Sequence, residues 1–439
     1  MEKMALGFIE KALKSVDPYQ LVHDQVVVSD GVLKIAGQQD SVDLSAFRNI
    51  FIIGAGKGTA PMAAAMEELL GDYLKTGVIT VKYGHGMPTR TVTVLEAGHP
   101  IPDENTLTHT RQMLKLADQA GEDDLVIVLL SGGGSALMEA LPESISLQKW
   151  ADLNQSLLAS GADITQINTI RKHLSLTKGG RLAQKIAPAQ TLTLILSDVI
   201  GDPLNSIASG PTAPDPTTFQ DALDIVKRFQ LEKNIAPAIL EYLQAGCAGQ
   251  IEENPKEGDT IFKKVRNHII GNNTLALKKL EQLAAEQGYQ TIILTDRARG
   301  EAREIAKILA AMVENALYSG FPVSSPACLI LGGEPTVTLQ GKGKGGRNQE
   351  LALAMLEALQ NVKKDFYFCS VGSDGTDGPT EAAGAWIDHR TMAKVKKVGL
   401  SIGDYLNRND SYHFFKEIDQ LIITGPTRTN VMDIMFCLI

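Results

Sequence analysis

The regular alternation of short apolar segments with helical patterns is the feature that most constrains the fold of this chain. Segments rich in Val, Ile and Leu on consecutive positions are typical of strands covered on both faces. One helical pattern begins near Asp103 and another follows Asn348. Strands that alternate with helices predict a doubly wound α/β sheet. We expect strands at residues 50–53, 78–81, 92–96, 125–130, 192–196, 269–270, 291–295, 327–331, 336–339, 366–371 and 421–423.

The length of 439 residues predicts more than one domain. Two proline-rich or polar stretches between about Pro211 and Gly258 favour a change of domain there. We therefore expect an N-terminal domain over residues 1–245 and a C-terminal domain over 246–439. The alternative is that both stretches are surface loops of one domain.

Charge and composition argue against two classes of partner. The chain has 42 Lys and Arg against 51 Asp and Glu, so its net charge is −9, and only 5% of its residues are aromatic. Nucleic-acid binding usually requires clustered cations or stacking aromatic side chains. No apolar run approaches the roughly 20 residues that span a membrane. We therefore expect neither a nucleic-acid nor a membrane partner.

The N-terminus and the cysteines predict a cytoplasmic protein. The first sixteen residues carry two glutamates and form an amphipathic helical pattern, unlike a signal peptide. Its apolar side consists of Phe8, Ile9, Ala12, Leu13 and Val16. Cysteines at positions 247, 328, 369 and 437 are far apart and form no C-x-x-C motif. We interpret them as buried thiols in a reducing compartment.

A glycine-rich turn follows the expected strand at 50–53. In FIIGAGKGTAPM, Gly54, Gly56 and Gly58 surround Lys57, so backbone N–H groups and a cation lie together. The spacing fits neither a P-loop nor a dinucleotide fingerprint, which has a third glycine where this chain has Thr59. Lys82 also stands where the fingerprint needs a ribose-binding acid. The alternative is a tight turn with a solvated lysine.

Two further segments after strands suit anions and cations respectively. The first segment can aim several backbone N–H groups at one anion, and it consists of Ser131, Gly132, Gly133, Gly134 and Ser135. The alternative is a plain turn. The segment contains no G-x-S-x-G motif of a serine nucleophile. Asp198 and Asp202, with nearby amide and hydroxyl oxygens, suit Mg²⁺. Alternatively, Asp198 caps a helix and Asp202 belongs to a turn.

Later loops add a cationic segment and more polar groups. In GKGKGGRNQ, Arg347 and Asn348 replace the Lys and Ser or Thr of a P-loop, and Arg347 could hold a phosphoryl group with two N–H groups. A mobile, solvated hairpin is the alternative. Polar groups also follow strands at Asp374, Asp377, Thr427 and Asn430, and weaker candidates are His85, His99, Arg171 and Lys172. Together these loops favour phosphoryl transfer, which depends on positioned cations and Mg²⁺.

Many of these segments, in this order, resemble the glycerate 2-kinase family, the class II glycerate kinases that end in a MOFRL domain. They include GAGKGTAPMA, LLSGGGSALM, NTIRKHLSLTKGGRLA, GKGGRNQELALA, GSDGTDGPT and TGPTRTNVMD. The resemblance implies ATP-dependent phosphorylation of D-glycerate at its 2-hydroxyl, giving 2-phospho-D-glycerate and ADP, with Mg²⁺. It also implies a Rossmann-like N-terminal domain, a C-terminal α/β domain with a MOFRL region at about 325–435, and an active site between them.

The resemblance places the family's important lysine and arginine at Lys57 and Arg347, and the loop chemistry described above suggests roles for the other site residues. We expect Lys57 and Arg347 to be catalytic, and Asp198 and Asp202 to bind metal. We expect substrate or phosphate contacts from Gly56, Ser131, Gly132, Gly133, Gly134, Ser135 and Arg171. We expect nucleotide contacts from Glu334, Asn348, Asp374, Thr427 and Asn430.

Two positions depart from the family pattern, and two other functions stay open. Arg428 stands where a glycine is commoner, and the final MFCLI lacks an expected arginine; we assign both to a last loop and an edge of the fold. The alternatives are an NAD(P)H-dependent hydroxypyruvate reductase and a non-catalytic protein that binds a nucleotide or sugar acid. We expect a small-molecule substrate and a monomer or homodimer.

Overall fold

The computed structural model describes all residues 1–439. The chain folds into two compact units. The first unit comprises Pro18–Ser197 and Asp202–Ile270, and the second comprises Met1–Asp17, Asp198–Gly201 and Gly271–Ile439. This division differs from the boundary expected between residues 245 and 246. The first unit continues to Ile270 because strand β9 (Val265–Gly271) belongs to its sheet, and the N-terminal helix packs in the second unit.

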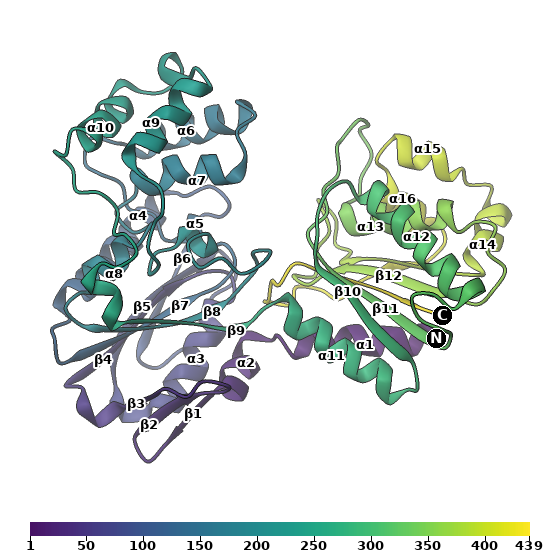
Figure 1. The fold of residues 1–439 in the computed structure, drawn as a ribbon, viewed down its shortest axis with the longest axis horizontal. Helices are drawn as coiled ribbons and strands as arrows, with labels where there is room; N and C mark the ends of the chain where they lie inside the picture. The colour runs from purple at the N-terminus through teal and green to yellow at the C-terminus, as the bar shows by residue number, and fades with distance from the viewer. The chain divides into compact units, whose positions relative to one another are not determined.

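The first unit is built on a six-stranded sheet with the strand order β6-β5-β4-β7-β8-β9 (Figure 1). The pairs from β6 through β8 are all parallel. The chain starts at the central strand β4, moves to one side, and then returns to continue on the other side through β7. Ligands bind at the carboxyl ends of the strands where such a reversal occurs. These strands are β4 (Asn49–Ala55), β5 (Leu74–Lys82), β6 (Val92–Ala97), β7 (Asp124–Leu130) and β8 (Gln190–Leu196).

Helices cover both faces of this sheet, so the doubly wound prediction is confirmed. Figure 1 shows α3 (Thr59–Leu70) and α2 (Pro18–Gln25) on one face and α4 (Glu104–Gln119) and α8 (Arg181–Ile186) on the other. Four further helices form a cluster with its own apolar core around Trp150 and Phe219. They are α6 (Leu147–Ala159), α7 (Ile164–His173), α9 (Phe219–Arg228) and α10 (Pro237–Cys247).

The second unit contains a six-stranded mixed sheet in the order β10-β11-β15-β12-β13-β14. Only β10 and β11 are parallel, and the remaining pairs are antiparallel. The strands are β10 (Gln290–Ala298), β11 (Ala327–Gly333), β12 (Tyr367–Gly372), β13 (Gly384–Asp388), β14 (Leu421–Ile422) and β15 (Asp433–Leu438).

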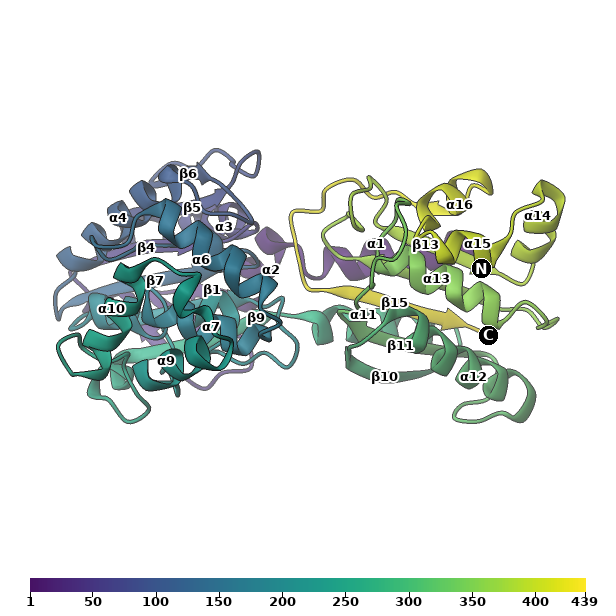
Figure 2. The ribbon, with the colours of Figure 1, turned by 90° about the horizontal axis from the view of Figure 1, so that it is seen from above.

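The two faces of the second sheet carry different helices (Figures 1 and 2). Helices α1 (Glu2–Lys14) and α11 (Asn273–Glu286) pack together on one face. The predicted amphipathic helix is confirmed, since all five residues of its apolar side are buried. The other face carries α12 (Ala302–Ser319), α13 (Arg347–Ala358), α14 (Thr391–Val398), α15 (Ile402–Asn407) and α16 (Ser411–Glu417).

Several local predictions were wrong. Residues 336–339 form no strand, and only Thr336 makes an isolated bridge, to Glu301. The sequence analysis missed β13, β15 and a small antiparallel sheet of β1 (Val26–Ser29), β2 (Val32–Ile35) and β3 (Ser41–Asp43). The last residues are not an edge, because β15 lies in the middle of its sheet and is fully buried.

Two further properties follow from the structure. Cys328, Cys369 and Cys437 are buried as expected, but Cys247 is exposed. None of the helices is both long enough and apolar enough to span a bilayer.

We predict that Gly54→Ala destabilises the first unit. A Cβ at Gly54 would lie 2.2 Å from the carbonyl oxygen of Leu129 in the adjacent strand. Overpacking of this kind typically costs about 1–3 kcal/mol. Chemical denaturation should show the loss, whereas Gly7→Ala, a helical position with open space, should gain about 0.5–1 kcal/mol. An unchanged unfolding free energy for Gly54→Ala would show that the strands separate at little cost.

Candidate active site

The turns after β4 and β7 are joined directly through their backbones. Lys57 N–H donates to the carbonyl of Gly132 at 2.8 Å, and Gly58 N–H donates to Ser131 Oγ at 2.9 Å. Gly56 has a φ of 143°, and a Cβ there would lie 2.1 Å from Ser131 Oγ. Only glycine permits this approach. The structure therefore brings together two of the predicted segments, at the point where the strand order reverses.

This joined turn has the features of an anion site. The N–H groups of Gly132, Gly133 and Ser135 donate to no acceptor within the protein, and Gly133 has a left-handed φ of 86°. Consecutive N–H groups in such a turn form a concavity that attracts anions. The half-buried Lys57 lies beside it, since its Cγ would be 3.5 Å from a Cβ at Gly133. The arrangement can hold a carboxylate or a phosphate.

Two histidines, His85 and His99, lie beside the same glycine turn. His85 Nδ1 lies 3.2 Å from the carbonyl oxygen of Lys57. His99 Nε2 would lie 2.8 Å from a Cβ at Gly133. Burial, with the positive charges of Lys57, Lys82 and His85, lowers the pKa of His99 to about 4. The sequence analysis named both histidines only as weak candidates, because nothing in their local pattern shows that they meet the glycine turn.

The other predicted substrate residues of the first unit have defined partners. The buried Ser131 hydroxyl contacts Thr59 Oγ1 at 3.0 Å, so it joins the two turns. Ser135 Oγ lies 2.6 Å from Ser209 Oγ. Arg171 Nε donates to Asn154 Oδ1 at 2.6 Å and leaves other N–H groups of its guanidinium available.

A buried ion pair near Arg171 was not predicted. Lys178 Nζ lies 2.5 Å from Glu139 Oε2, both side chains are buried, and Ser175 donates to the same carboxylate. Burial lowers the pKa of Arg171, and the negative charge of Glu139 opposes that shift. The sequence contained no signal for this pair, because its partners are joined only by the tertiary fold.

In the second unit, Arg347 is held by two carboxylates. Its Nε and Nη2 donate to the two oxygens of buried Asp433 at 2.6 and 3.0 Å, and its Nη1 donates to Glu334 at 2.9 Å. Burial lowers the pKa of Arg347, but the charge of Asp433 more than offsets this and raises the pKa above its ordinary value. Predicted residues Arg347 and Glu334 are thus brought together. Asp433 was missed because β15 was not recognised as a strand.

Asn348 and Asp377 have structural positions at the start of α13. Asp377 is buried and accepts the backbone N–H groups of Asn348 and Gln349 at 3.0 and 2.9 Å, which caps the helix. Burial raises the pKa of Asp377. Asn348 is also buried, and its amide oxygen accepts from Ser370 at 2.5 Å. Its predicted nucleotide contact stays a prediction.

The cationic loop before Arg347 is anchored, unlike the mobile hairpin that was the alternative for this segment. Asn409 Oδ1 accepts the N–H groups of Gln340 and Gly341 at 2.8 and 2.9 Å. Asp410 accepts the N–H of Lys344 at 3.0 Å, and Lys344 Nζ lies 4.7 Å from the ring centre of Tyr412. The segment at residues 409–412 therefore supports the loop.

The remaining predicted residues lie in loops after the strands. Thr427 Oγ1 donates to the carbonyl of Ser373 at 2.6 Å, and Thr427 N–H donates to the carbonyl of Asp374 at 3.4 Å. Asn430 Nδ2 donates to Asp198 Oδ2 at 3.1 Å within the second unit. Asp202 belongs to the first unit. The structure contains no cluster of three His, Cys, Asp or Glu side chains that could hold a metal.

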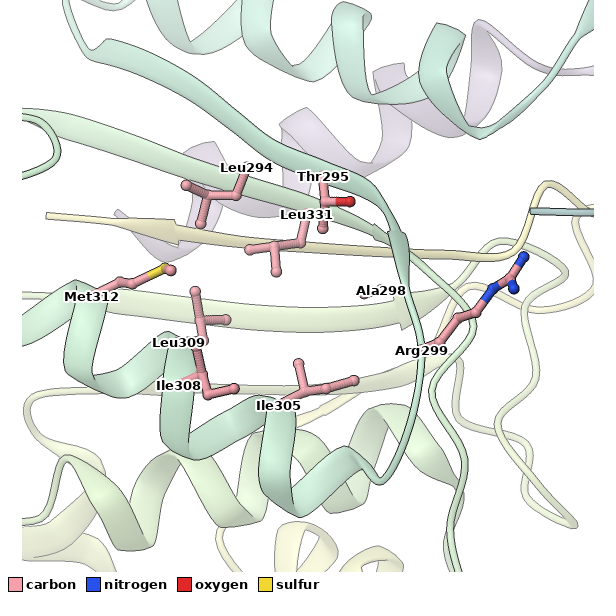
Figure 3. Close-up of a pocket in the computed structure, with 9 residues that line it drawn as sticks. All are labelled: Leu294, Thr295, Ala298, Arg299, Ile305, Ile308, Leu309, Met312 and Leu331. Atoms are coloured by element: carbon pink, nitrogen blue, oxygen red, sulfur yellow. The ribbon is translucent and has the colours of Figure 1, made fainter. Parts of the chain in front are cut away.

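One cavity of about 230 Å³ lies between β10 and α12 in the second unit (Figure 3). Its lining is mostly apolar, and in Figure 3 the Arg299 guanidinium extends away from the apolar side chains. None of the predicted site residues lines it. The lining residues are Leu294, Thr295, Ala298, Arg299, Ile305, Ile308, Leu309, Met312 and Leu331. Apart from Thr295 and Arg299, its lining offers no polar side chain for phosphoryl transfer.

Comparison with known proteins gives matches along the whole chain. The family model of a domain of unknown function, DUF4147, matches residues 4–244, and that of the MOFRL family matches residues 327–433. D-glycerate 2-kinase of Thermotoga maritima is 40% identical, over 100% of this chain and 98% of the relative. A putative hydroxypyruvate reductase of Agrobacterium vitis is also 40% identical, over 88% of this chain and 98% of that protein.

Solved structures agree with these sequence matches. The crystal structure of glycerate kinase from Thermotoga maritima superposes with a TM-score of 0.88 at 39% identity, over 100% of this chain and 99% of that one. These matches along the whole chain define the protein as a kinase. The chain belongs to the glycerate 2-kinase family.

We predict that Arg347→Lys is nearly as damaging as Arg347→Ala. Lysine keeps the charge but cannot satisfy both oxygens of buried Asp433. Removing one partner of a buried pair typically costs about 3–5 kcal/mol. Denaturation and the kinetic constants should both report the loss in each variant.

A matched control is Arg297→Lys, because the Arg297 side chain is 67% exposed. Its unfolding free energy should stay within about 0.5 kcal/mol of the wild-type value. If Arg347→Lys retained wild-type stability and kcat, charge alone would suffice at this position.

Proposed function

We propose that this protein transfers the terminal phosphoryl group of ATP to the 2-hydroxyl of D-glycerate, giving 2-phospho-D-glycerate and ADP. The observation that carries the proposal is the relationship to a D-glycerate 2-kinase along the whole chain. The glycine turn beside Lys57 supports it independently, because both the substrate and the transferred group are anions.

We assign the glycine turn of the first unit to the bound anion. N–H groups of Gly132, Gly133 and Ser135 are oriented by the backbone bonds that join the two turns. Donors fixed in place before the reaction stabilise developing charge without a cost of reorganisation. Lys57 adds a positive charge at the same turn. Arg171 is proposed to bind the carboxylate of the substrate through its remaining N–H groups.

We assign the nucleotide to loops of the second unit, at Glu334, Arg347, Asp374, Thr427 and Asn430. Arg347 uses three of its five N–H groups internally, so two remain for a phosphate. The bidentate contact with Asp433 fixes the plane in which these two groups point.

Mg²⁺ is proposed as the metal, with Asp198 as its protein ligand and Asp202 as a second candidate. Kinases commonly hold this ion through one or two carboxylates and the substrate phosphates, so a complete protein cage is not required. A carboxylate beside the amide of Asn430 fits a hard cation of this kind. When bound, Mg²⁺ neutralises charge on the phosphate oxygens.

The hydroxypyruvate reductase reading is the second candidate, because two relatives carry that name as putative. Such a reductase would bind a dinucleotide, whose ribose usually contacts an acid at the end of the second strand. In this chain β5 ends at Lys82, which contributes positive charge near His99. This observation favours the kinase.

Product analysis distinguishes the two functions. With ATP, Mg²⁺ and D-glycerate, phosphorus NMR should identify 2-phosphoglycerate. Formation of 3-phosphoglycerate would contradict the proposed position of phosphorylation. Oxidation of NADH or NADPH by hydroxypyruvate, without phosphorylated product, would support the reductase instead.

We predict that Lys57→Ala lowers kcat by about 10²–10³-fold, the typical loss for one oriented charge-stabilising donor. Folding should be normal, because Lys57 is only half-buried and lies in a turn. Lys75→Ala, which removes an exposed lysine from β5, is the matched control and should retain activity. Near-normal turnover of Lys57→Ala would leave Lys57 as a surface charge only.

We predict that Asp198→Asn raises the Mg²⁺ concentration needed for half-maximal activity. The amide keeps the shape of the side chain but loses the charge that a hard cation requires. Metal titrations of Asp198→Asn and Asp202→Asn, run in parallel, should show which carboxylate is the ligand. An unchanged metal requirement in both variants would place the ion elsewhere.

A further inference from the structure

His99 occupies a position that packing alone does not explain. It follows β6 by two residues and is half-buried, yet neither ring nitrogen makes a hydrogen bond in the structure. Its Nε2 faces the glycine turn, within 2.8 Å of where a Cβ of Gly133 would lie. The absent side chain of Gly133 therefore lets the edge of the imidazole approach the turn directly.

The charges around His99 come from two of the strand ends. Lys57 follows β4, Lys82 ends β5, and His85 lies in the next loop; the turn at Gly132–Gly134 adds no titratable group. Burial and these cations keep the imidazole neutral at pH 7. A neutral imidazole has one nitrogen with a lone pair that can accept a proton.

We propose that His99 contacts the acceptor substrate at the Gly133 turn and accepts the proton of the hydroxyl that is phosphorylated. This inference rests on the proposed kinase function. The hydroxyl oxygen forms the new bond to the terminal phosphorus of ATP, and the bond from that phosphorus to the bridging oxygen breaks. ADP leaves with the electron pair, the hydroxyl proton moves to Nε2, and the imidazolium later releases it to water.

Bound anions make this proton transfer feasible. In the free protein, cations disfavour protonation of His99. A carboxylate and phosphates beside the same turn offset those cations and raise the pKa of His99 towards the working pH. A general base is most effective when its pKa lies near that pH. The group should therefore titrate at lower pH in the free protein than in the ternary complex.

The test compares His99→Gln with His109→Gln. Glutamine places a polar amide near the Nε2 position but cannot take up the proton. His109 is a half-buried histidine on α4 outside the site, so its variant controls for the chemical change. We expect His99→Gln to lower kcat by about 10²–10⁴-fold with a KM within a few-fold of wild type. It should also abolish the fall of kcat at acidic pH, whereas His109→Gln should behave as wild type.

The outcomes separate this inference from the proposed function. Suppose that the wild-type protein forms 2-phosphoglycerate, and that His99→Gln keeps the wild-type kcat and the same fall of kcat at acidic pH. His99 is then not the proton acceptor, whereas the kinase function stands. If the wild-type protein forms no phosphorylated product, the proposed function fails.

In either case, proton NMR of His99, assigned with the glutamine variant, tests the contact directly. Addition of D-glycerate should raise the pKa of His99. An unchanged pKa at saturating D-glycerate would overturn the contact.

Discussion

The site of the first unit depends on how closely the backbone at Gly56 approaches Ser131. A side chain at Gly56 would occupy the position of Ser131 Oγ, so the two turns can join only because it is absent. The hydrogen bond from Lys57 N–H to Gly132 then locks the turns together. The backbone of Lys57 and the unbonded N–H groups are consequently held in place by backbone contacts.

An ion pair between half-buried Arg347 and buried Asp433 has the corresponding role in the second unit. Asp433 begins β15, the central strand, and Arg347 begins α13, so their bidentate contact connects the sheet to the helix above it. Asp377 caps the same helix through two backbone N–H groups. Because Asp433 is buried, loss of Arg347 would leave an unpaired carboxylate inside the domain.

Much of the architecture could be predicted from local pattern. Strands β4 and β7 are largely runs of consecutive apolar residues, because both of their faces are covered. Glycine turns were recognisable because the residue type itself reports an unusual backbone. β13 and β15 were missed because one is short and contains small residues, and the other follows a turn-rich segment at the end of the chain.

The partners of the site residues were harder to predict than the residues themselves. Asp433 lies far from Arg347 in the sequence, and no periodicity connects them. The same holds for His99 and Gly133, which meet because their strands belong to one parallel sheet. Sequence pattern reports which residues follow strands, whereas the strand order decides which of them face one another.

The positive charges of the two units differ in whether carboxylates balance them. Arg347 is neutralised by Asp433 and Glu334, so its remaining N–H groups contribute direction more than net charge. At His99, by contrast, burial lowers the pKa most, and the charges of Lys57, Lys82 and His85 lower it further with no carboxylate to oppose them. An anion that binds in the turn is therefore stabilised by these positive charges. By the same interaction, the anion raises the pKa of His99. Binding of the substrate and activation of its hydroxyl are thus two consequences of one local field.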